Sequence, residues 1–529
     1  MPAAACAVVL SAAGVALFAA AGTLEAPALS AQRPDVVVIQ TDDQTLSDLY
    51  ATLPRPGGGR IAVMPVTRQR IGDRGVTFNR YYASTPLCCP SRTTLLTGRY
   101  SHNHRVLNND SPGGYPGFRA HDLRDNIAIW LQDAGYRTVH VGKFLNHYGG
   151  EDPLEEPPGW NEWRTLVNDA RYFYGYQLNR DGELAGPFGD RTYALRDDPG
   201  CPDPTPPQPC NYLTDALTSY AVDAISGAGA RPLYLQLDYT APHGDVLKPP
   251  GPEPAPRDDG SVGDIRAPRV PGFDERDIAD KPRFIRRIGR LTPSEIHRLD
   301  LRYQDRIEAL RSVDEGIGRV LDALAARSGL THAYVFFLSD NGFFQGEHRF
   351  DVAKFLPYEP ANHLPLLVRG PGIPADRHSG ELIANVDIAP TLLEITGATP
   401  SIAPDGRSIL PFARDLGRRT RRPILLEGFA EGSGEPGNSR AGASIAATPR
   451  DYEGIRFSHW KYVEYRSGEA ELYDLRIDPH ELRSLAREPR YRSLRSWFHR
   501  RLATLQGCAG ESCRRPLRGP LPNPIPLTR

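Results

Sequence analysis

The chain has 529 residues, 40% of them hydrophobic and 24% charged, and its 63 Lys and Arg nearly balance its 64 Asp and Glu, for a formal net charge of −1. A near-neutral chain with this apolar content can bury a large core, which excludes a wholly disordered or fibrous protein. Without a basic excess, the composition gives no reason to expect a nucleic-acid partner.

The N-terminal segment is strongly apolar. Residues 2–21 are almost all Ala, Val, Leu and Gly, and mostly small residues follow up to Arg33. This pattern predicts a signal peptide over residues 1–31, although no Lys or Arg precedes the apolar run. The run is almost long enough to span a bilayer, so an N-terminal membrane anchor is the alternative. No later stretch is long and apolar enough, so we expect a secreted or extracytoplasmic protein with no membrane span in its mature chain.

The positions of the cysteines also favour export. Cys201 and Cys210 bracket a Pro-rich segment, and Cys508 and Cys513 lie close together near the end of the chain. Two short-range disulfides at these pairs fit an oxidising compartment. The adjacent Cys88 and Cys89 are left over, and neighbouring cysteines rarely bond to each other.

Apolar runs that alternate with helical patterns fill most of the chain. The clearest helical pattern is residues 295–325, where apolar residues recur every three or four positions. Alternation of strands and helices predicts an α/β sheet flanked on both faces, in a catalytic domain over residues 34–412. The runs expected to form strands are residues 36–40, 136–142, 232–239, 333–340 and 364–370.

The composition changes after this domain. Residues 413–450 are rich in Arg, Gly and Ser and are predicted to form a surface connection. Beyond it, residues 455–465 and 470–475 are typical of an antiparallel hairpin, and an amphipathic helix is expected around 488–505. We therefore predict a small α+β C-terminal domain over residues 451–529.

Acidic and amide side chains follow two of the expected strands. Asp42 and Asp43 come directly after the first strand, and Asp340 and Asn341 follow the fourth. Ligands of open α/β sheets bind outside the carboxyl ends of the strands. Three carboxylates converging there would repel one another unless a cation neutralised them, and oxygen ligands select calcium or magnesium. Either pair alone is typical of a turn or a helix cap, but the two together predict a metal site.

Lysine is rare enough to be informative. Only five of the 63 basic residues are lysines, and Lys143 directly follows an expected strand while Lys354 lies six residues after His348. Compact ammonium groups suit the oxygens of a tetrahedral anion, whereas exposed surface lysines are the alternative. His243, in the loop after the third strand, is a candidate to protonate a leaving oxygen or to bind an anion.

The segment 84–100, STPLCCPSRTTLLTGRY, places a cysteine at the start of a helix. Pro90 and Ser91 can begin a helix, so Cys88 lies near its N-terminus with Arg92 one turn inside. This setting favours an activated group that faces an anion. A thiolate is nevertheless a poor neighbour for a hard cation, which prefers oxygen donors. Unmodified cysteine chemistry therefore fits this position badly.

At this segment the chain resembles the formylglycine-dependent sulfatases. Residues 88–92, CCPSR, and 95–99, LLTGR, match the signature of that family. The resemblance implies an alkaline-phosphatase-like fold, with a large mixed and mostly parallel sheet sandwiched by helices and an antiparallel sheet in the smaller C-terminal domain. It extends in order through TDDQ (41–44), GKFLNHYG (142–149), APHGD (241–245), SDNG (339–342), GEHRFDVAK (346–354) and ELYDLRIDPHEL (471–482).

The resemblance assigns a role to each candidate residue. It implies that a formylglycine-generating enzyme oxidises Cys88 to formylglycine, whose hydrate attacks the sulfur of a sulfate monoester. Arg92 would orient the hydrate, Lys143 and Lys354 would neutralise the sulfate oxygens, and His243 would assist at the leaving group. The implied substrate is a sulfated carbohydrate or an aryl sulfate. The implied metal is calcium rather than magnesium, held by Asp42, Asp43, residue 88, Asp340 and Asn341.

Two positions bear on the branch of the family. The pattern from Lys143 to Asn146 resembles the sulfatases that act on 6-sulfated N-acetylglucosamine and on heparan sulfate. Leu145 stands where many sulfatases have histidine, and His147 stands where this branch often has glutamate. Loop packing is the alternative for the residues that we expect to line the substrate pocket, which are His102, His104, Asn146, His147 and His348.

Two further functions remain open at this point. A phosphate or phosphonate ester hydrolase could use the same scaffold, but one metal cluster and two lysines favour sulfate. A non-catalytic secreted glycan-binding protein would be expected to have lost some residues of the catalytic motifs, whereas nearly all of the expected positions are filled here. The basic stretches, residues 283–290 and the arginines between Arg483 and Arg501, could attract a polyanionic sugar chain, with solvated helix faces as the alternative.

Overall fold

The structure is a computed structural model in which residue 1 and residues 33–55, 57–110, 113–168, 172–188, 212–245, 250–429 and 451–523 are described. Most of the expected signal peptide, the expected Cys201–Cys210 disulfide and residues 430–450 lie outside the described residues. Within the described ranges, no helix combines the length and the apolarity needed to cross a membrane.

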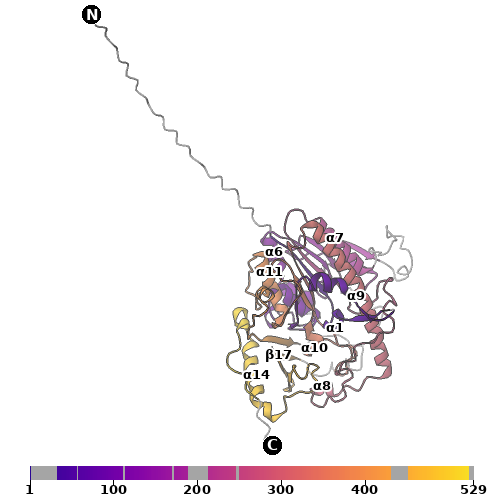
Figure 1. Cartoon of the computed structure of the whole chain (residues 1–529), viewed down its shortest axis with the longest axis vertical. Helices are drawn as coiled ribbons and strands as arrows, with labels where there is room; N and C mark the ends of the chain where they lie inside the picture. The colour runs from indigo at the N-terminus through magenta and orange to yellow at the C-terminus, as the bar shows by residue number, and fades with distance from the viewer. Residues whose placement is uncertain are drawn as a thin grey trace. The chain divides into compact units, whose positions relative to one another are not determined.

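A mixed sheet runs through the larger part of the molecule (Figure 1). Strands β11, β1, β10, β6 and β7 run parallel to one another, whereas the strands toward both edges include antiparallel pairs. The predicted α/β class is confirmed. Among the described residues ten strands pair in the order β14 (Arg377–Ser379), β4 (Val76–Phe78), β13 (Leu366–Arg369), β11 (Ala333–Ser339), β1 (Asp35–Thr41), β10 (Leu233–Asp238), β6 (Arg137–Gly142), β7 (Glu162–Leu166), β8 (Tyr176–Arg180) and β9 (Glu183–Phe188).

Helices cover both faces of this sheet because alternate strand residues point to opposite sides. Val37 and Ile39 of β1 belong to one core, with α7 (Leu213–Ser226) and α9 (Pro293–Arg327). Val36 and Val38 belong to the core on the other face. Each fully buried aliphatic side chain contributes about 1.5–3 kcal/mol, so the two faces fix the register of the strand. The second core is covered by α3 (Cys88–Thr97), α6 (Ile127–Asp133) and α11 (Ile388–Thr396).

The helix predicted over residues 295–325 is α9, which extends slightly further at both ends. Thr292 caps its N-terminus, because its side chain accepts a hydrogen bond from the backbone N–H of Glu295 and the Glu295 carboxylate accepts one from the backbone N–H of Thr292. Pro293 occupies the first turn. This capping box satisfies donors that the first turn of a helix would otherwise leave unpaired.

The C-terminal part contains a separate antiparallel sheet of β16 (Ile424–Gly428), β17 (Tyr452–Phe457), β18 (Trp460–Tyr465) and β19 (Ala470–Asp474). Helix α14 (Arg492–Leu505) covers it, with Phe498 stacked on Tyr462 at a centroid distance of 5.9 Å. The expected disulfide joins Cys508 and Cys513. This sheet and the main sheet belong to one compact unit, Pro34–Arg529.

The C-terminal sheet differs from the prediction at two places. The segment 455–465 forms two strands rather than one, because the chain reverses at Ser458, whose φ is +53°. The segment 413–450, expected to be a connection, contains β16, which pairs with β17 through residues 424–428. Its short apolar run lies between Arg-rich and Gly-rich sequence, and these flanks dominate the composition of the segment.

Short elements complete the described structure. The helices are α1 (Leu46–Leu49), α2 (Pro65–Thr67), α4 (Ser101–His104), α5 (Gly114–His121), α8 (Arg283–Arg286), α10 (Glu359–Asn362) and α12 (Leu410–Arg414). The strands are the pair β2 (Thr52–Pro54) and β3 (Arg60–Ala62) and the small sheet of β12 (His363–Leu364), β5 (Tyr81–Tyr82) and β15 (Ile383–Ala384).

Candidate active site

The carboxyl ends of the central parallel strands bring the predicted polar residues together. Asp42 and Asp43 follow β1, and Asp340 follows its neighbour β11. The backbone N–H of Asp43 donates to Asp340 Oδ1 at 3.1 Å, which joins the two strand ends. Asp43 adopts a φ of +66°, so the chain turns sharply there and both acidic side chains remain buried at the sheet edge.

Helix α3 presents its N-terminus to this sheet edge, and Cys88 is its first residue. The hydroxyl of Ser91 donates to the carbonyl oxygen of Asp340, which ties the first turn to the end of β11. The helix ends at Gly98, whose φ is +67° and where a Cβ would lie 2.9 Å from the Cβ of Pro404. Cys88 therefore lies at the positive end of the helix dipole, as the sequence predicts.

The thiol of Cys88 is enclosed by two ammonium groups and a carboxylate. Its Sγ lies 3.0 Å from Nζ of Lys354, 3.8 Å from Nζ of Lys143 and 3.6 Å from Oδ1 of Asp42. The residue is only 1% exposed. Burial, followed by the charge of Asp42, raises the pKa of Cys88 to about 12. An unmodified Cys88 would therefore remain a neutral thiol at physiological pH and would be a weak nucleophile.

Each of the two lysines bridges Cys88 and an aspartate. Lys143 also donates to Oδ2 of Asp42, and Lys354 donates to Oδ1 of Asp43 at 2.8 Å. Both side chains are only 7% exposed, which does not fit the alternative of surface lysines. The pKa of Asp42 lies well below its usual range because Lys143, together with neighbouring cations, outweighs the opposing effect of burial.

Arg92 fixes the same carboxylates from one turn inside α3. Its Nε donates to Oδ2 of Asp340 at 2.9 Å, and its Nη2 lies 3.3 Å from Oδ2 of Asp42. Its Nη1 donates to the carbonyl oxygen of Lys143 at 2.8 Å. One buried guanidinium thus connects the ends of three strands, which is the geometry for which its planar fork of donors is suited.

His243 lies beside the acidic cluster. Its Nε2 is 3.7 Å from Oδ2 of Asp43, and its Nδ1 lies 2.9 Å from the carbonyl oxygen of Gly244. Burial lowers the pKa of His243, so the neutral ring is favoured. In that form the carbonyl contact places the proton on Nδ1 and leaves Nε2 as the nitrogen that faces the site.

The carboxylates of this cluster fit a hard divalent cation, whereas the sulfur of Cys88 does not. One ligand atom each from Asp42, Asp43, Cys88 and His243 lies within 4.8 Å of the others. Oδ1 of Asn341 is buried and has no hydrogen-bond partner among the described residues, although its Nδ2 donates to Asp43. Burial and the nearby carboxylates raise the pKa of Asp340 to about 7. A cation would engage the unpaired amide oxygen and offset this repulsion.

The loop that carries Lys354 rests on the C-terminal sheet. The hydroxyl of Tyr452 donates to the carbonyl oxygen of Phe355 at 2.6 Å, and Nζ of Lys461 donates to that of Pro357 at 2.9 Å. The hydroxyl of Tyr358 donates to Glu471 at 2.9 Å. Strands β17, β18 and β19 therefore each hold one point of this loop.

Three of the five expected pocket residues have partners elsewhere in the protein. Nδ1 of His102 lies 2.5 Å from Glu427, and its Nε2 lies 2.8 Å from the carbonyl oxygen of Cys508. His104 is buried, with its Nε2 3.0 Å from the Thr94 hydroxyl and its Nδ1 accepting from a backbone N–H. His348 is buried with its Nδ1 2.6 Å from Glu275. These contacts hold the three side chains against neighbouring parts of the protein.

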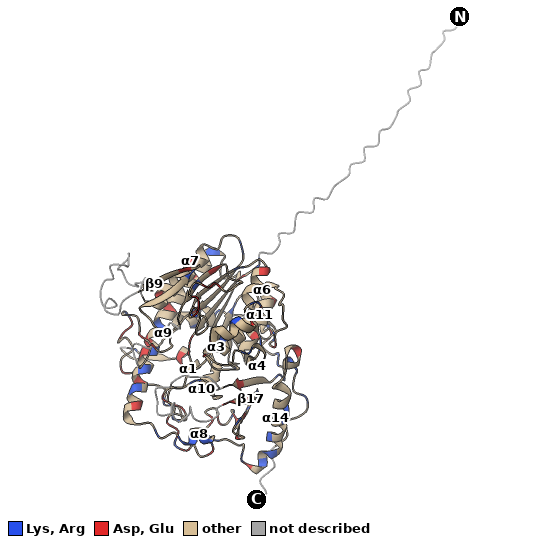
Figure 2. Ribbon diagram, turned by 180° about the vertical axis from the view of Figure 1, so that it is seen from behind, with Lys and Arg blue, Asp and Glu red and all other residues tan. Residues whose placement is uncertain are grey.

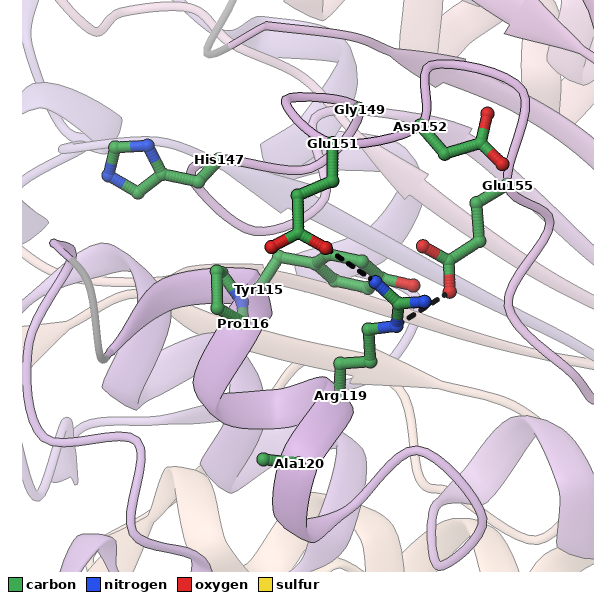
Figure 3. Close-up of a pocket in the computed structure, with 9 residues that line it drawn as sticks. All are labelled: Tyr115, Pro116, Arg119, Ala120, His147, Gly149, Glu151, Asp152 and Glu155. Carbon is green, nitrogen blue, oxygen red and sulfur yellow. Dashed lines mark hydrogen bonds and ion pairs between the residues drawn. The ribbon is translucent and has the colours of Figure 1, made fainter.

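Asn146 and His147 lie on the loop that follows Lys143. The backbone N–H of Asn146 donates to Sγ of Cys89 at 3.1 Å, so this loop adjoins α3. His147 is on the wall of a cavity of about 240 Å³, and its side chain is 40% exposed. In Figure 3, Arg119 points toward Glu151 and Glu155, with which it forms ion pairs of 2.8 and 3.4 Å, while the His147 ring lies apart from them.

A buried polar network beneath the site contains residues that the sequence analysis did not identify. Oδ2 of Asp238 lies 3.7 Å from Nη1 of Arg92 and 3.1 Å from Nε2 of His140. Gln40 and Gln236 donate to the same carboxylate. The available signal was a polar residue inside otherwise apolar strands, as in VVVIQ, TVHVG and YLQLD. Such residues are rarely buried without partners.

Comparison with known proteins identifies the family. The family description "Sulfatase" matches residues 34–398, and "N-sulphoglucosamine sulphohydrolase, C-terminal" matches residues 346–507. The chain belongs to the sulfatase family. The sulfatase is 31% identical to human N-acetylglucosamine-6-sulfatase over 519 residues, covering 92% of its own chain and 87% of the relative.

Other matches agree with this assignment. The sulfatase is 31% identical to the extracellular sulfatase SULF-1 homolog of Drosophila melanogaster over 394 residues, 74% of its own chain but only 32% of that relative. A solved structure described as a complex with its substrate D-glucosamine-2-N,6-O-disulfate superposes with a TM-score of 0.69 at 21% identity, covering 90% of the sulfatase and 98% of that chain. The alkaline-phosphatase-like fold expected from the sequence is confirmed.

Proposed function

We propose that this sulfatase hydrolyses sulfate monoesters of sugars such as 6-sulfated N-acetylglucosamine, with formylglycine made from Cys88 as its nucleophile. The arrangement of two buried ammonium groups on either side of a buried helix-start cysteine carries this proposal. The likeness to human N-acetylglucosamine-6-sulfatase supports the choice of sugar. The extracellular relative and the apolar N-terminus support a secreted enzyme.

Conversion of Cys88 removes the mismatch between sulfur and the acidic cluster. The hydrate of formylglycine supplies one hydroxyl that attacks sulfur and a second hydroxyl whose deprotonation expels sulfate. Cys88 is almost completely buried in the folded chain, so the formylglycine-generating enzyme would have to act before α3 packs against the sheet. Helix α3 then holds residue 88 in place through the contacts of Ser91 and Arg92 with Asp340.

The surrounding side chains have separate tasks in this mechanism. Lys143 and Lys354 neutralise the sulfate oxygens, and because they are already fixed by Asp42 and Asp43 they need little reorganisation. Arg92 orients residue 88 by holding the strand ends beneath it. The Gly244 carbonyl holds the Nδ1 proton of His243, so Nε2 faces the site, where it must first take up a proton before it can pass that proton to the leaving oxygen.

Asp42, Asp43, Asp340 and Asn341 are the residues that would hold calcium together with residue 88. Calcium accepts several carboxylate and amide oxygens in one site, whereas magnesium retains more of its water. When bound, the cation would neutralise the acidic cluster and attract negative charge that develops on the substrate. The unpaired Oδ1 of Asn341 supports its inclusion.

Mass spectrometry of the peptide that contains Cys88 tests the nucleophile. In active protein from a host with the modifying enzyme, we expect residue 88 to have lost its sulfur and to carry an aldehyde or its hydrate. A paired assay with 4-nitrophenyl sulfate and 4-nitrophenyl phosphate, followed by 6-sulfated N-acetylglucosamine, tests the reaction. An intact thiol in active enzyme, or a fully active Cys88→Ala variant, would contradict the mechanism. Faster turnover of the phosphate ester would favour a phosphate ester hydrolase.

A further inference from the structure

The structure brings two arginine-rich segments together at one end of the molecule. Residues 283–290 contain four arginines and no acidic residue, and residues 483–501 contain seven arginines and only Glu488 as an acid. Figure 2 shows ribbon segments coloured blue for Lys and Arg at α8 and along α14, both on the side of the molecule where the C-terminus lies. Solvated helix faces would not require two segments so far apart in sequence to meet.

Glu469, in the turn between β18 and β19, connects the two segments. Its Oε1 lies 3.5 Å from Nη2 of Arg286 and 3.8 Å from Nη2 of Arg487. The backbone N–H of Arg283 also donates to this carboxylate at 3.0 Å. The Glu469 carboxylate thus contacts both α8 and the segment that leads into α14.

A groove of about 630 Å³ lies beside this carboxylate. Its walls include Arg487 and the face of α14 that contains Arg495 and His499. Arg492 is exposed on the same face, one turn before Arg495, because residues three or four positions apart are neighbours on a helix surface. We call this surface, defined by Arg487, Arg492, Arg495 and His499, the arginine groove.

The arginine groove carries excess positive charge. Its two carboxylates already have partners: Glu464 lies 2.5 Å from both the Tyr462 hydroxyl and Nδ1 of His499, and Glu469 pairs with arginines. In the described part of the chain, neither Arg492 nor Arg495 forms an ion pair with a carboxylate. Because the whole chain has a net charge of only −1, this is a local concentration of charge.

We propose that the arginine groove binds a sulfated segment of the polysaccharide whose sulfate esters the active site cleaves. The identity of this polymer rests on the proposed function. Guanidinium groups bind sulfate and carboxylate oxygens through two parallel hydrogen bonds, and a glycosaminoglycan presents such groups at regular intervals. The tyrosines that line the groove, Tyr462 and Tyr465, are each only 3% exposed, so they offer no open ring for the base stacking that favours single-stranded nucleic acids.

A matched pair of triple variants tests the proposal. The groove variant combines Arg487→Gln, Arg492→Gln and Arg495→Gln, and Gln keeps helix propensity and hydrogen-bonding capacity. The control combines Arg124→Gln, Arg266→Gln and Arg298→Gln, which removes the same charge at exposed positions outside the groove. We expect the groove variant to elute from immobilised heparin at lower salt and to bind a heparin oligosaccharide about tenfold more weakly. The control should change by less than about twofold.

Binding is measured on the Cys88→Ala protein, so the result does not depend on turnover. Thermal unfolding checks that both triple variants are folded. When Cys88 is retained, the three groove substitutions should leave the turnover of 4-nitrophenyl sulfate unchanged. Equal weakening in both triple variants, or none in the groove variant, would overturn the proposal. The proposal would also be overturned if a DNA duplex of matched charge bound as tightly as heparin and if the groove substitutions weakened its binding to the same extent. If the protein with intact Cys88 cleaves no sulfate ester but the groove still binds heparin, the result would instead count against the proposed function.

Discussion

The proposed role of Lys354 can be tested separately from that of residue 88. Its Nζ contacts both Sγ of Cys88 and Oδ1 of Asp43 and is almost completely buried. We expect Lys354→Met, which keeps the length of the side chain, to lower kcat for 4-nitrophenyl sulfate about 10²–10³-fold, the usual cost of removing one preorganised donor. Steady-state kinetics with protein of verified formylglycine content provide the measurement. Exposed Arg298→Gln is the control, and a fall of less than about threefold for Lys354→Met would exclude its assigned role.

Asp238 is a positioning residue that acts through Arg92. The change Asp238→Asn preserves shape but removes the charge that faces Nη1 of Arg92 and leaves the contacts of Gln40, Gln236 and His140 imperfectly matched. We expect a loss of about 1–3 kcal/mol in the free energy of unfolding, because the partners of a buried group lose hydrogen bonds. Denaturant unfolding measures this loss.

Kinetics distinguish positioning by Asp238 from stability alone. If Asp238 positions Arg92, kcat of the folded Asp238→Asn variant should fall while KM changes little, since the side chain does not contact the substrate. Thr218→Ala is a suitable comparison, because it removes the buried contact of Thr218 with the Tyr239 hydroxyl, away from Arg92. Equal kinetic effects from both variants would show that stability alone is responsible.

At the level of secondary structure, β16 is attached to α4 through His102. Nδ1 of His102 lies 2.5 Å from Glu427 of β16, and the N–H of Ser101 donates to the same carboxylate at 3.0 Å. Burial lowers the pKa of His102, but the hydrogen bond and charge of Glu427 outweigh it and raise the pKa to about 9. Because this value exceeds that of an unfolded histidine, the contact stabilises the protein fully below about pH 6.5 and loses its effect as the pH rises through about 9.

The variant His102→Gln tests this contact. We expect it to lower the midpoint of thermal unfolding more at pH 6 than at pH 9.5, because only the protonated histidine gains from Glu427. The exposed His297→Gln, on α9, should show no such difference between the two pH values. An effect of His102→Gln that is the same at both pH values would mean that packing, rather than charge, accounts for its role.

The elements that the sequence predicts well are those whose signal is local. The apolar runs at residues 36–40 and 333–340 fix two central strands, and the polar residues that follow them are necessarily at the site because parallel strands end at one edge. The turn at Ser458 was missed because neither Gly nor Asn marks it. The role of His102 was missed because Glu427 is 325 positions away in the sequence, and no local pattern reports such a contact.

At the scale of the whole molecule, the acidic cluster links metal binding to stability. If calcium binds here as proposed, its removal would leave Asp42, Asp43 and Asp340 facing one another, with Arg92 and the two lysines as compensating charges. A ligand present at about 100 times its Kd stabilises the folded state by about 2.7 kcal/mol. We therefore expect a chelator to lower Tm by several degrees, and added calcium to restore it at lower concentration than magnesium. Unchanged Tm after verified metal removal would contradict the assignment of these residues.

The support of the Lys354 loop by β17, β18 and β19 bears on protein engineering. A chimera that joins residues 34–412 to the C-terminal part of another sulfatase would retain all of the proposed active-site residues. It would nevertheless lose any of the three contacts to this loop for which the new C-terminal part lacks a matching side chain. Chimeras of two sulfatases should therefore take residues 342–358 and the C-terminal sheet from the same parent protein.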